Sequence, residues 1–165
     1  MEEHLRSVEL TVIGSISTPH ISIENMPIQS VGAKDQIGIA EVYPEYAEGL
    51  TDLEDFSHII LFYHFHKQKN YQLKVKPFMD DSEHGVFATR SPKRPAKLGF
   101  SIVELIKIEG AKIYFEGADM LDGTPLIDIK PFFRTFDNRT NAVSGWLDTK
   151  DEAVVKKVRS DKRFA

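Results

Sequence analysis

Two loops of this chain concentrate side chains that could bind a polar ligand. The first, at residues 85–95, reads GVFATRSPKRP and carries Arg90, Lys93 and Arg94. The second, at residues 118–132, reads ADMLDGTPLIDIKPF and carries three aspartates. Proline and glycine restrict the backbone of both, which predicts loops that hold their polar groups in fixed directions. We therefore expect the functional site in these two loops.

The three aspartates of the second loop have different local surroundings. The sequence DGTP at 122–125 is typical of a turn whose aspartate accepts backbone N–H groups, and a direct ligand contact by Asp122 is an equal alternative. Asp128 and Lys130 share one face of a strand, which favours a structural ion pair over catalysis. Asp119 has no evident local partner. We expect Asp119 to accept hydrogen bonds from a ligand hydroxyl or amine.

His58, His64 and His66 are separated by even numbers within one predicted strand, so they share a face. A three-histidine metal site fits these residue types. However, His58 lies about 20 Å or more from His66 at the rise of a strand, too far for one ion. We expect His64 and His66 to form a polar wall of a ligand pocket, with no metal. A metal-dependent hydrolase that uses this pair is the less favoured alternative.

The 165-residue chain has no cysteine, which excludes disulfides, thiolate nucleophiles and cysteine-ligated zinc. Its serines lack a nucleophile-elbow context, and its glycines form neither a dinucleotide-binding nor a P-loop pattern. No apolar run approaches the ~20 residues of a membrane span, and the start MEEHLRSVEL does not read as a secretory signal. The expectation is a cytoplasmic globular protein without a membrane segment.

Charge is distributed unevenly along the chain. Residues 1–66 hold eleven acids and two bases, whereas residues 67–165 hold fourteen acids and nineteen bases, although the whole chain carries −4. Most such basic runs are solvated surface, but pooled positive potential also attracts polyanions. The second half therefore gives a weak indication of nucleic-acid binding. Its basic clusters are Lys67, Lys69, Lys74 and Lys76; 90–97; and Lys156, Lys157, Arg159, Lys162 and Arg163.

Most of the chain reads as β-strand. Gly110 in IKIEGAKIYF can take a positive φ, which predicts an antiparallel hairpin. The loops around 17–35 and 67–84 are long, as functional loops often are. The whole pattern predicts a small all-β barrel or sandwich. The predicted strands, rich in β-branched and aromatic residues, are 8–16, 36–42, 57–66, 85–89, 99–108 and 112–117.

Helix is predicted at two places. The acidic segment 44–56 suits one short helix or turn. In the tail, Thr149 and Glu152 have capping-box spacing, and three valines between 154 and 158 form an apolar stripe. We expect a helix over 150–159 that packs on the barrel.

Several of these blocks occur together, in one order, in a known family. GVFATRSP, DMLDGTP with DIKP, the PIQ at 27–29, the LEDFSH at 53–58 and the IGSI at 13–16 resemble the TsaA-like family, also called TrmO. The resemblance covers roughly residues 8–136. It implies a closed β-barrel that dimerises and holds S-adenosylmethionine between barrel strands near the subunit interface. It also implies an enzyme that methylates threonylcarbamoyladenosine beside the anticodon of tRNA.

Carried over by motif, the resemblance assigns residues to roles. The S-adenosylmethionine pocket would be formed by Pro27, Ile28, Gln29, His66, Lys67, Arg90, Leu98, Phe100, Asp119, Met120, Leu121 and Asp122. The acceptor nitrogen carries a proton that Asp122 or His66 could remove as the catalytic base. The tRNA substrate would be bound, chiefly at phosphates, by Lys93, Arg94, Lys97 and Lys130.

The chain departs from the family pattern at two places. Ala96 and Lys97 stand where the family has Asn-Pro, and Phe132 stands where it has Tyr. The missing polar groups affect the specificity for the acceptor more than the binding of the donor. Their absence favours an alternative function, a dimeric S-adenosylmethionine-binding module that regulates a partner. The retained Arg90 and DGTP loop favour the enzyme. Residues 1–140 are expected to form the barrel domain and 141–165 a tail.

Overall fold

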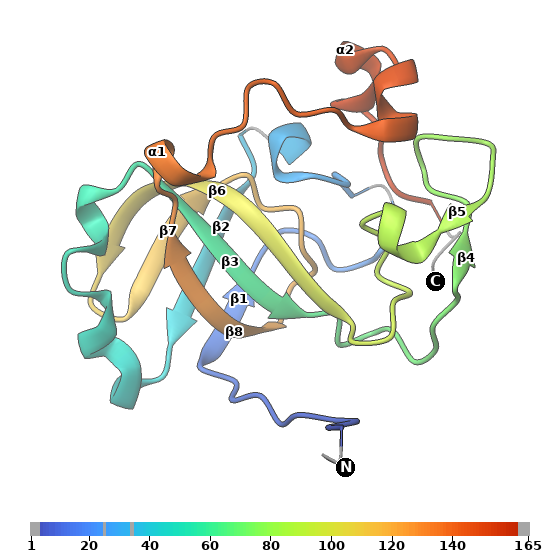
Figure 1. Ribbon diagram of the computed structural model, residues 1–165. Helices are drawn as coiled ribbons and strands as arrows, with labels where there is room; N and C mark the ends of the chain where they lie inside the picture. The colour runs from blue at the N-terminus through green and yellow to red at the C-terminus, as the bar shows by residue number, and fades with distance from the viewer. Residues whose placement is uncertain (1–3, 25, 34, 162–165) are drawn as a thin grey trace.

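The computed structural model describes residues 4–24, 26–33 and 35–161. Its body is a closed barrel of six antiparallel strands, which confirms the predicted β-barrel (Figure 1). No helix among these described residues is both long enough and apolar enough to span a membrane. In order around the barrel, the strands are β1 (Gly14–Ser17), β2 (Ile37–Val42), β7 (Lys112–Glu116), β6 (Leu98–Glu109), β3 (His58–His64) and β8 (Thr124–Pro131).

The barrel interior is filled by alternate residues of each strand. On β3, Ile59, Leu61 and Tyr63 are buried, whereas the residues between them are partly exposed. Phe115 on β7 is completely buried and pairs with Gly38 on β2. A Cβ atom at Gly38 would lie 2.4 Å from Cζ of Phe115, so only glycine leaves room for the ring.

The predicted hairpin is confirmed. β6 and β7 pair antiparallel up to Glu109 and Lys112, and Gly110 in the turn has φ 60°. β8 was not among the six predicted strand segments. It lies in the second polar loop, residues 118–132, directly after a turn in which Gly123 has φ 77°, and it closes the barrel by pairing with both β1 and β3.

Two predicted strands differ from the structure. Of the segment 8–16, only the end joins β1, because residues 8–12 have no strand partner among the described residues. The segment 85–89 is mainly the 3₁₀ helix η4 (Val86–Ala88). It follows a two-residue ladder between β4 (Lys74–Val75) and β5 (His84–Gly85). β-propensity predicts side chains that suit a strand, but a strand also needs a partner.

Both predicted helices are shorter than expected. Segment 44–56 forms the 3₁₀ helices η2 (Pro44–Leu50) and η3 (Leu53–Asp55), separated at Asp52, whose φ is 69°. The tail helix α2 (Glu152–Val155) is capped by Asp151, which accepts from the Val154 N–H. Thr149 is not the cap, because its hydroxyl donates to the Trp146 carbonyl instead. The remaining short helices are η1 (Ser30–Ala33), α1 (Arg134–Asp137) and η5 (Gly145–Thr149).

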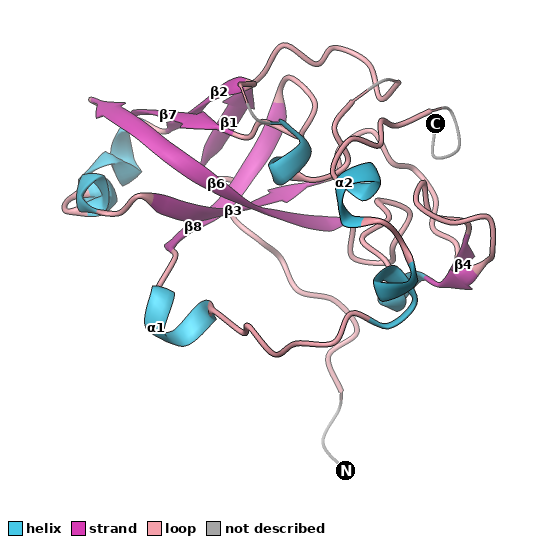
Figure 2. Ribbon diagram, turned by 90° about the horizontal axis from the view of Figure 1, so that it is seen from above, coloured by secondary structure: helices cyan, strands magenta, loops and turns pink. Residues whose placement is uncertain are grey.

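The long loops and the tail gather at one side of the barrel. Figure 1 shows the loop after β1, the β4–β5 segment and the tail around α2 to the right of the barrel, and Figure 2 shows β4 and α2 on the same side. The tail contacts both loops: Trp146 stacks on His84, and Ser160 donates its N–H to the Met26 carbonyl. The candidate functional site is therefore built where segments distant in sequence meet.

Candidate functional site

A cavity of about 270 Å³ lies between the barrel end and these loops. Apolar side chains form much of its wall, including Ile28, Phe78 and Phe100. Polar side chains from several segments reach it, among them Arg90 and Asp119. A concave, largely apolar site with a few convergent polar groups is the usual form of a small-molecule pocket.

A chain of hydrogen bonds runs from the barrel interior to Asp119. The Ser101 hydroxyl donates to Oδ1 of Asp119 at 2.6 Å, and the hydroxyls of Tyr63 and Ser101 are 2.8 Å apart. Loss of hydration raises the pKa of Asp119 to about 7, although the Ser101 hydrogen bond opposes the shift. Burial, followed by the nearby Asp119, raises the pKa of Tyr63 well above its usual value. The cavity thus contains a carboxyl group that changes charge near neutral pH.

Gly99 leaves room for the Tyr63 ring, whose hydroxyl begins this chain of hydrogen bonds. A Cβ atom at Gly99 would lie 2.5 Å from Cε2 of Tyr63 and 2.7 Å from Cζ of Phe65. Those two rings pack edge to face, with centroids 5.7 Å apart. The glycine that follows Leu98 on β6 therefore allows the aromatic floor of the cavity to form.

Arg90 brings a positive charge whose attraction opposes the rise in the pKa of this carboxyl group. Its Nη1 donates to Oε1 of Gln29 at 2.6 Å, and its Cζ lies 4.8 Å from the centre of the Phe100 ring. These contacts join the loop at 27–29, the loop at 85–95 and strand β6. They hold one face of the guanidinium against an aromatic ring.

The structure brings together all the residues expected in the donor pocket except Asp122. The lining includes Pro27, Ile28, Gln29, His66, Lys67, Arg90, Leu98, Phe100, Asp119, Met120 and Leu121. These residues come from five separate stretches of sequence. They line one cavity, and their role in binding a donor stays a prediction.

Asp122 does not line the cavity, unlike the other residues expected in the donor pocket. Its Oδ1 accepts the backbone N–H of Thr18 at 3.0 Å, and its own N–H donates to the His20 carbonyl at 2.7 Å. Asp122 therefore has the turn role that the DGTP sequence left open. The turn ties the start of β8 to the chain after β1, and it leaves Asp119 as the carboxylate of the cavity.

The expected pair of histidines is also separated. His66 lines the cavity, whereas His64 does not. The strand ends at His64, and a tight turn, in which the His66 N–H donates to the His64 carbonyl, changes the direction of the chain. Burial, assisted by the positive charge of Lys67, lowers the pKa of His66. The described residues contain no group of three or more side chains placed to hold a metal ion.

The cations expected to contact phosphate have different roles. Nη1 of Arg94 donates to three carbonyl groups of its own loop, those of Val86, Thr89 and Ser91, at 3.4, 3.0 and 3.1 Å. Arg94 therefore braces the loop, and its expected contact with tRNA phosphate stays a prediction. A guanidinium with several donors suits this task.

The remaining cations lie at varied positions. Lys97 has φ 51°, and its carbonyl accepts the Phe65 N–H, so its backbone fixes the entry to β6. Lys93 is partly buried. Nζ of Lys130 lies 3.2 Å from Oδ2 of Asp128, which confirms the predicted ion pair, and neither residue lines the cavity.

Of the lining residues that the sequence analysis did not identify, three lie in the tail. Trp146, Ser160 and Asp161 all reach the cavity, although nothing in the local sequence connects them to the two loops. Trp146 is the only tryptophan in the chain, which was the one available signal. Lys162 and Arg163 of the last basic cluster lie outside the described residues.

The chain matches known proteins along most of its length. Residues 15–138 match the family described as the tRNA-methyltransferase O N-terminal domain. A probable S-adenosyl-L-methionine-binding protein from Pyrococcus abyssi is 49% identical over 152 residues, which cover 92% of this chain and 82% of that protein. A mouse tRNA (adenine(37)-N6)-methyltransferase is 44% identical over 101 residues, which cover 59% of this chain and 23% of that protein.

Solved structures agree with the sequence matches. The crystal structure of TrmO from Pseudomonas aeruginosa superimposes with a TM-score of 0.74 at 32% identity, and the match covers 89% of this chain and 64% of that one. This chain therefore spans less than two thirds of that longer structure. With residues 15–138 matched and the barrel shared, the chain belongs to the tRNA-methyltransferase O family.

Proposed function

We propose that this protein transfers a methyl group from S-adenosylmethionine to tRNA. The observation that carries the proposal is the cavity in which Asp119 and Arg90 lie among apolar walls. Relatives named as S-adenosyl-L-methionine-binding proteins and as tRNA (adenine(37)-N6)-methyltransferases support the donor and the acceptor, respectively. The finer proposal is that the acceptor is threonylcarbamoyladenosine beside the anticodon.

The side chains that line the cavity fit S-adenosylmethionine. Apolar Pro27, Ile28 and Phe100 would pack against its flat adenine ring. Asp119, which can take a negative charge, would accept from ribose hydroxyls or the amino group, and Arg90 would complement the carboxylate. When bound, the donor supplies a methyl group on a positively charged sulfur, and its loss leaves a neutral thioether.

Positioning is the main task of the protein in this reaction. The acceptor nitrogen forms a bond to the methyl carbon as the carbon–sulfur bond breaks, which requires close alignment more than a strong base. The proton of the acceptor nitrogen must leave. His66 lines the cavity, and its lowered pKa keeps the ring neutral and able to accept that proton. Asp122 is held in its turn by backbone contacts, so His66 is the proposed base.

The tRNA surface is proposed beside the mouth of this cavity. Lys67 lines the cavity and is exposed, and the following segment 69–76 adds three more exposed lysines without an acid. Such a cluster would contact phosphates, which position a nucleic acid without reading its sequence. Transfer RNA is found in the cytoplasm, so we expect the protein there.

We also propose a homodimer through the outer face of β6. Phe100 and Ile102 are both 39% exposed on that face, and Phe62 of β3 stacks on Phe100 at 6.5 Å. A wider groove of about 880 Å³ next to them is lined in part by Gln29 and Phe87. A second copy would cover this apolar surface next to the donor cavity. Sedimentation of wild type and of Ile102→Asp tests the proposal, since the variant should be monomeric.

A non-catalytic S-adenosylmethionine-binding module is the second candidate. The long match to a protein named only for binding, together with Ala96, Lys97 and Phe132 in place of the family residues, favours it. The two candidates differ in one outcome, methyl transfer.

The deciding experiment uses methyl-labelled S-adenosylmethionine with two tRNA preparations, one carrying threonylcarbamoyladenosine and one lacking it. Mass spectrometry of the digested nucleosides should find the label only on the modified adenosine. Label on another nucleoside would refute the finer proposal. Calorimetric donor binding without any transfer would favour the binding module, and no donor binding by folded protein would refute both.

A further inference from the structure

A segment beyond the family match forms one wall of the cavity. The match ends at residue 138, but Trp146, Ser160 and Asp161 line the cavity with the family residues. We call residues 144–161 the strap. Figure 1 shows the chain running from α1 across to α2 and then down beside the β4–β5 segment.

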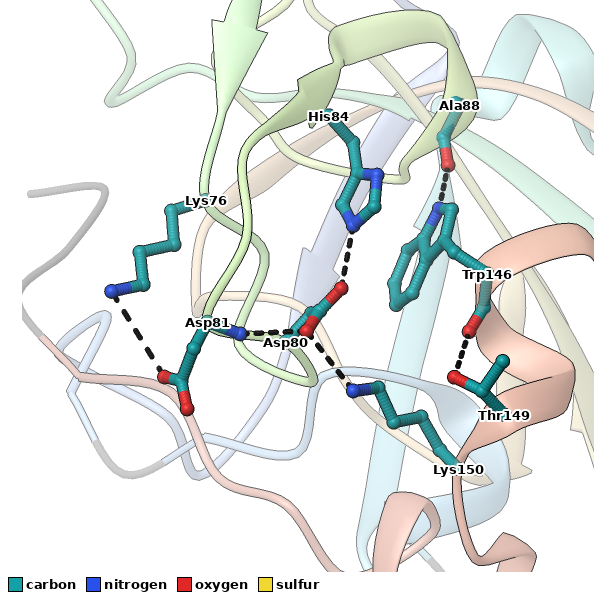
Figure 3. A network of polar contacts seen from close by, with 8 residues as sticks. All are labelled: Lys76, Asp80, Asp81, His84, Ala88, Trp146, Thr149 and Lys150. Atoms are coloured by element: carbon teal, nitrogen blue, oxygen red, sulfur yellow. Dashed lines mark hydrogen bonds and ion pairs between the residues drawn. The ribbon is translucent and has the colours of Figure 1, made fainter.

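The first anchor of the strap is Trp146. Its indole stacks on the His84 ring, with centroids 4.6 Å apart and an interplanar angle of 14°. Its Nε1 donates to the Ala88 carbonyl at 2.8 Å. Figure 3 shows the indole beside His84 and below Ala88. Trp146 is thereby fixed to the residue that precedes Thr89, which lines the cavity.

The second anchor is an ionic contact from Lys150. Its Nζ lies 3.0 Å from Oδ1 of Asp80, whose other oxygen lies 2.6 Å from Nε2 of His84 (Figure 3). These contacts, first that of His84 and then that of Lys150, lower the pKa of Asp80. Asp80 directly follows Met79, which lines the cavity. The strap thus holds the loop at 77–90 at three of its residues, Asp80, His84 and Ala88.

The third anchor lies at the end of the strap, on the opposite loop. The Ser160 N–H donates to the Met26 carbonyl and its Oγ accepts the Met26 N–H, both at 2.8 Å. The Ser160 hydroxyl also donates to the Ile23 carbonyl. Arg159 donates to the Gly32 carbonyl at 3.0 Å. Gly32 permits a close approach here, since a Cβ atom would lie 2.5 Å from the Lys156 carbonyl oxygen.

The strap therefore connects two loops that both line the cavity. The loop at 23–29 contributes Met26, Pro27 and Ile28, and the loop at 77–90 contributes Met79 and Arg90. Apart from short helices and a two-residue ladder, both loops lack regular structure. Such segments are otherwise the easiest to open locally.

We propose that the strap completes the donor site, so that donor binding and strap docking stabilise each other. The inference rests on the proposed function, because the ligand is S-adenosylmethionine. A docked strap holds both loops in the binding geometry before the donor arrives, so less ordering accompanies binding. By linkage, the bound donor must hold the strap down to the same extent. The strap residues Trp146 and Ser160 would then set donor affinity together with Arg90 and Asp119.

The single tryptophan gives a direct test in the wild-type chain. Titration with S-adenosylmethionine should change the emission of Trp146 in parallel with the heat of binding. Hydrogen exchange should show slower exchange at residues 144–161 in the donor complex. Donor binding with unchanged emission and unchanged strap exchange would overturn the inference while leaving the proposed function intact.

Variants of the strap residues measure the coupling between strap docking and donor binding. Trp146→Ala should raise the donor Kd by about tenfold, within the roughly 5- to 150-fold range of coupled sites. Ser160→Ala should act in the same direction, and Trp146→Phe, which keeps the stack, should have a smaller effect. Val154→Ala is the matched control, because Val154 is 62% exposed on the same strap and lies outside the cavity lining.

Thermal unfolding of each variant shows whether the barrel remains folded. If Trp146→Ala does not fold, Ser160→Ala and the wild-type exchange experiment decide the question. Folded variants whose Kd stays within about twofold of wild type, well below the range of coupled sites, would refute the inference. Absence of donor binding by wild type would refute the proposed function and this inference with it.

Discussion

Asp119→Asn tests the electrostatics of the cavity without any ligand. The pKa of Asp119 is raised from 3.8 to about 7 in the folded chain, mainly because the group loses hydration. Between these two pH values the folded state holds a proton that the unfolded state has released. The free energy of unfolding should therefore fall as pH rises from about 4 to about 7 and level off above that. A shift of about three units corresponds to roughly 4 kcal/mol, an upper limit for this contribution.

Asparagine keeps the shape of the side chain and can still accept from Ser101, but it cannot ionise. Relative to wild type, the variant should gain stability progressively from pH 4 to 7. The measurement is urea denaturation of both proteins at several pH values between 4 and 8. Because both chains contain the same six histidines, the difference between them isolates Asp119. A constant difference across this pH range would refute the raised pKa and the burial that causes it.

Three further predictions concern the barrel, the basic loop and metal. Gly38→Ala should lower the free energy of unfolding by about 1–3 kcal/mol, because its Cβ would meet the Phe115 ring at 2.4 Å; thermal unfolding measures this. Arg94→Ala should weaken donor binding as well as tRNA binding, since three loop carbonyls lose their donor. In contrast, Lys69→Glu should mainly reduce the salt-dependent binding of tRNA, because Lys69 is exposed and lies outside the cavity lining. A chelator should leave the calorimetric donor affinity unchanged, because the described residues hold no cluster of metal ligands.

Clear outcomes would contradict each of these. A Gly38→Ala protein as stable as wild type would show that Phe115 can move aside. An Arg94→Ala protein that loses only tRNA affinity would return Arg94 to the phosphate-binding role. Donor binding abolished by the chelator and restored by zinc would support the histidine metal site that the structure gives no reason to expect.

The sequence by itself determined the strands that depend on local patterns. Alternation located β2, β3, β6 and β7 to within a few residues, and Gly110 marked the hairpin between the last two. Motif blocks also identified eleven of the residues that line the cavity. Periodicity and turn chemistry are properties of neighbouring residues, which is why a single sequence contains them.

Only the tertiary structure decided which of the polar residues face the cavity. Asp122 and Asp119 are three positions apart, yet one caps a backbone N–H that lies 104 residues away and the other ends a buried chain of hydroxyls. Arg94 turned inward to its own loop, and Trp146 reached the site from the tail. A hydrogen-bond partner and the loss of hydration both depend on atoms brought close by folding. For these residues the sequence supplies the chemical groups, and the barrel with its strap supplies the surroundings that give each group its role.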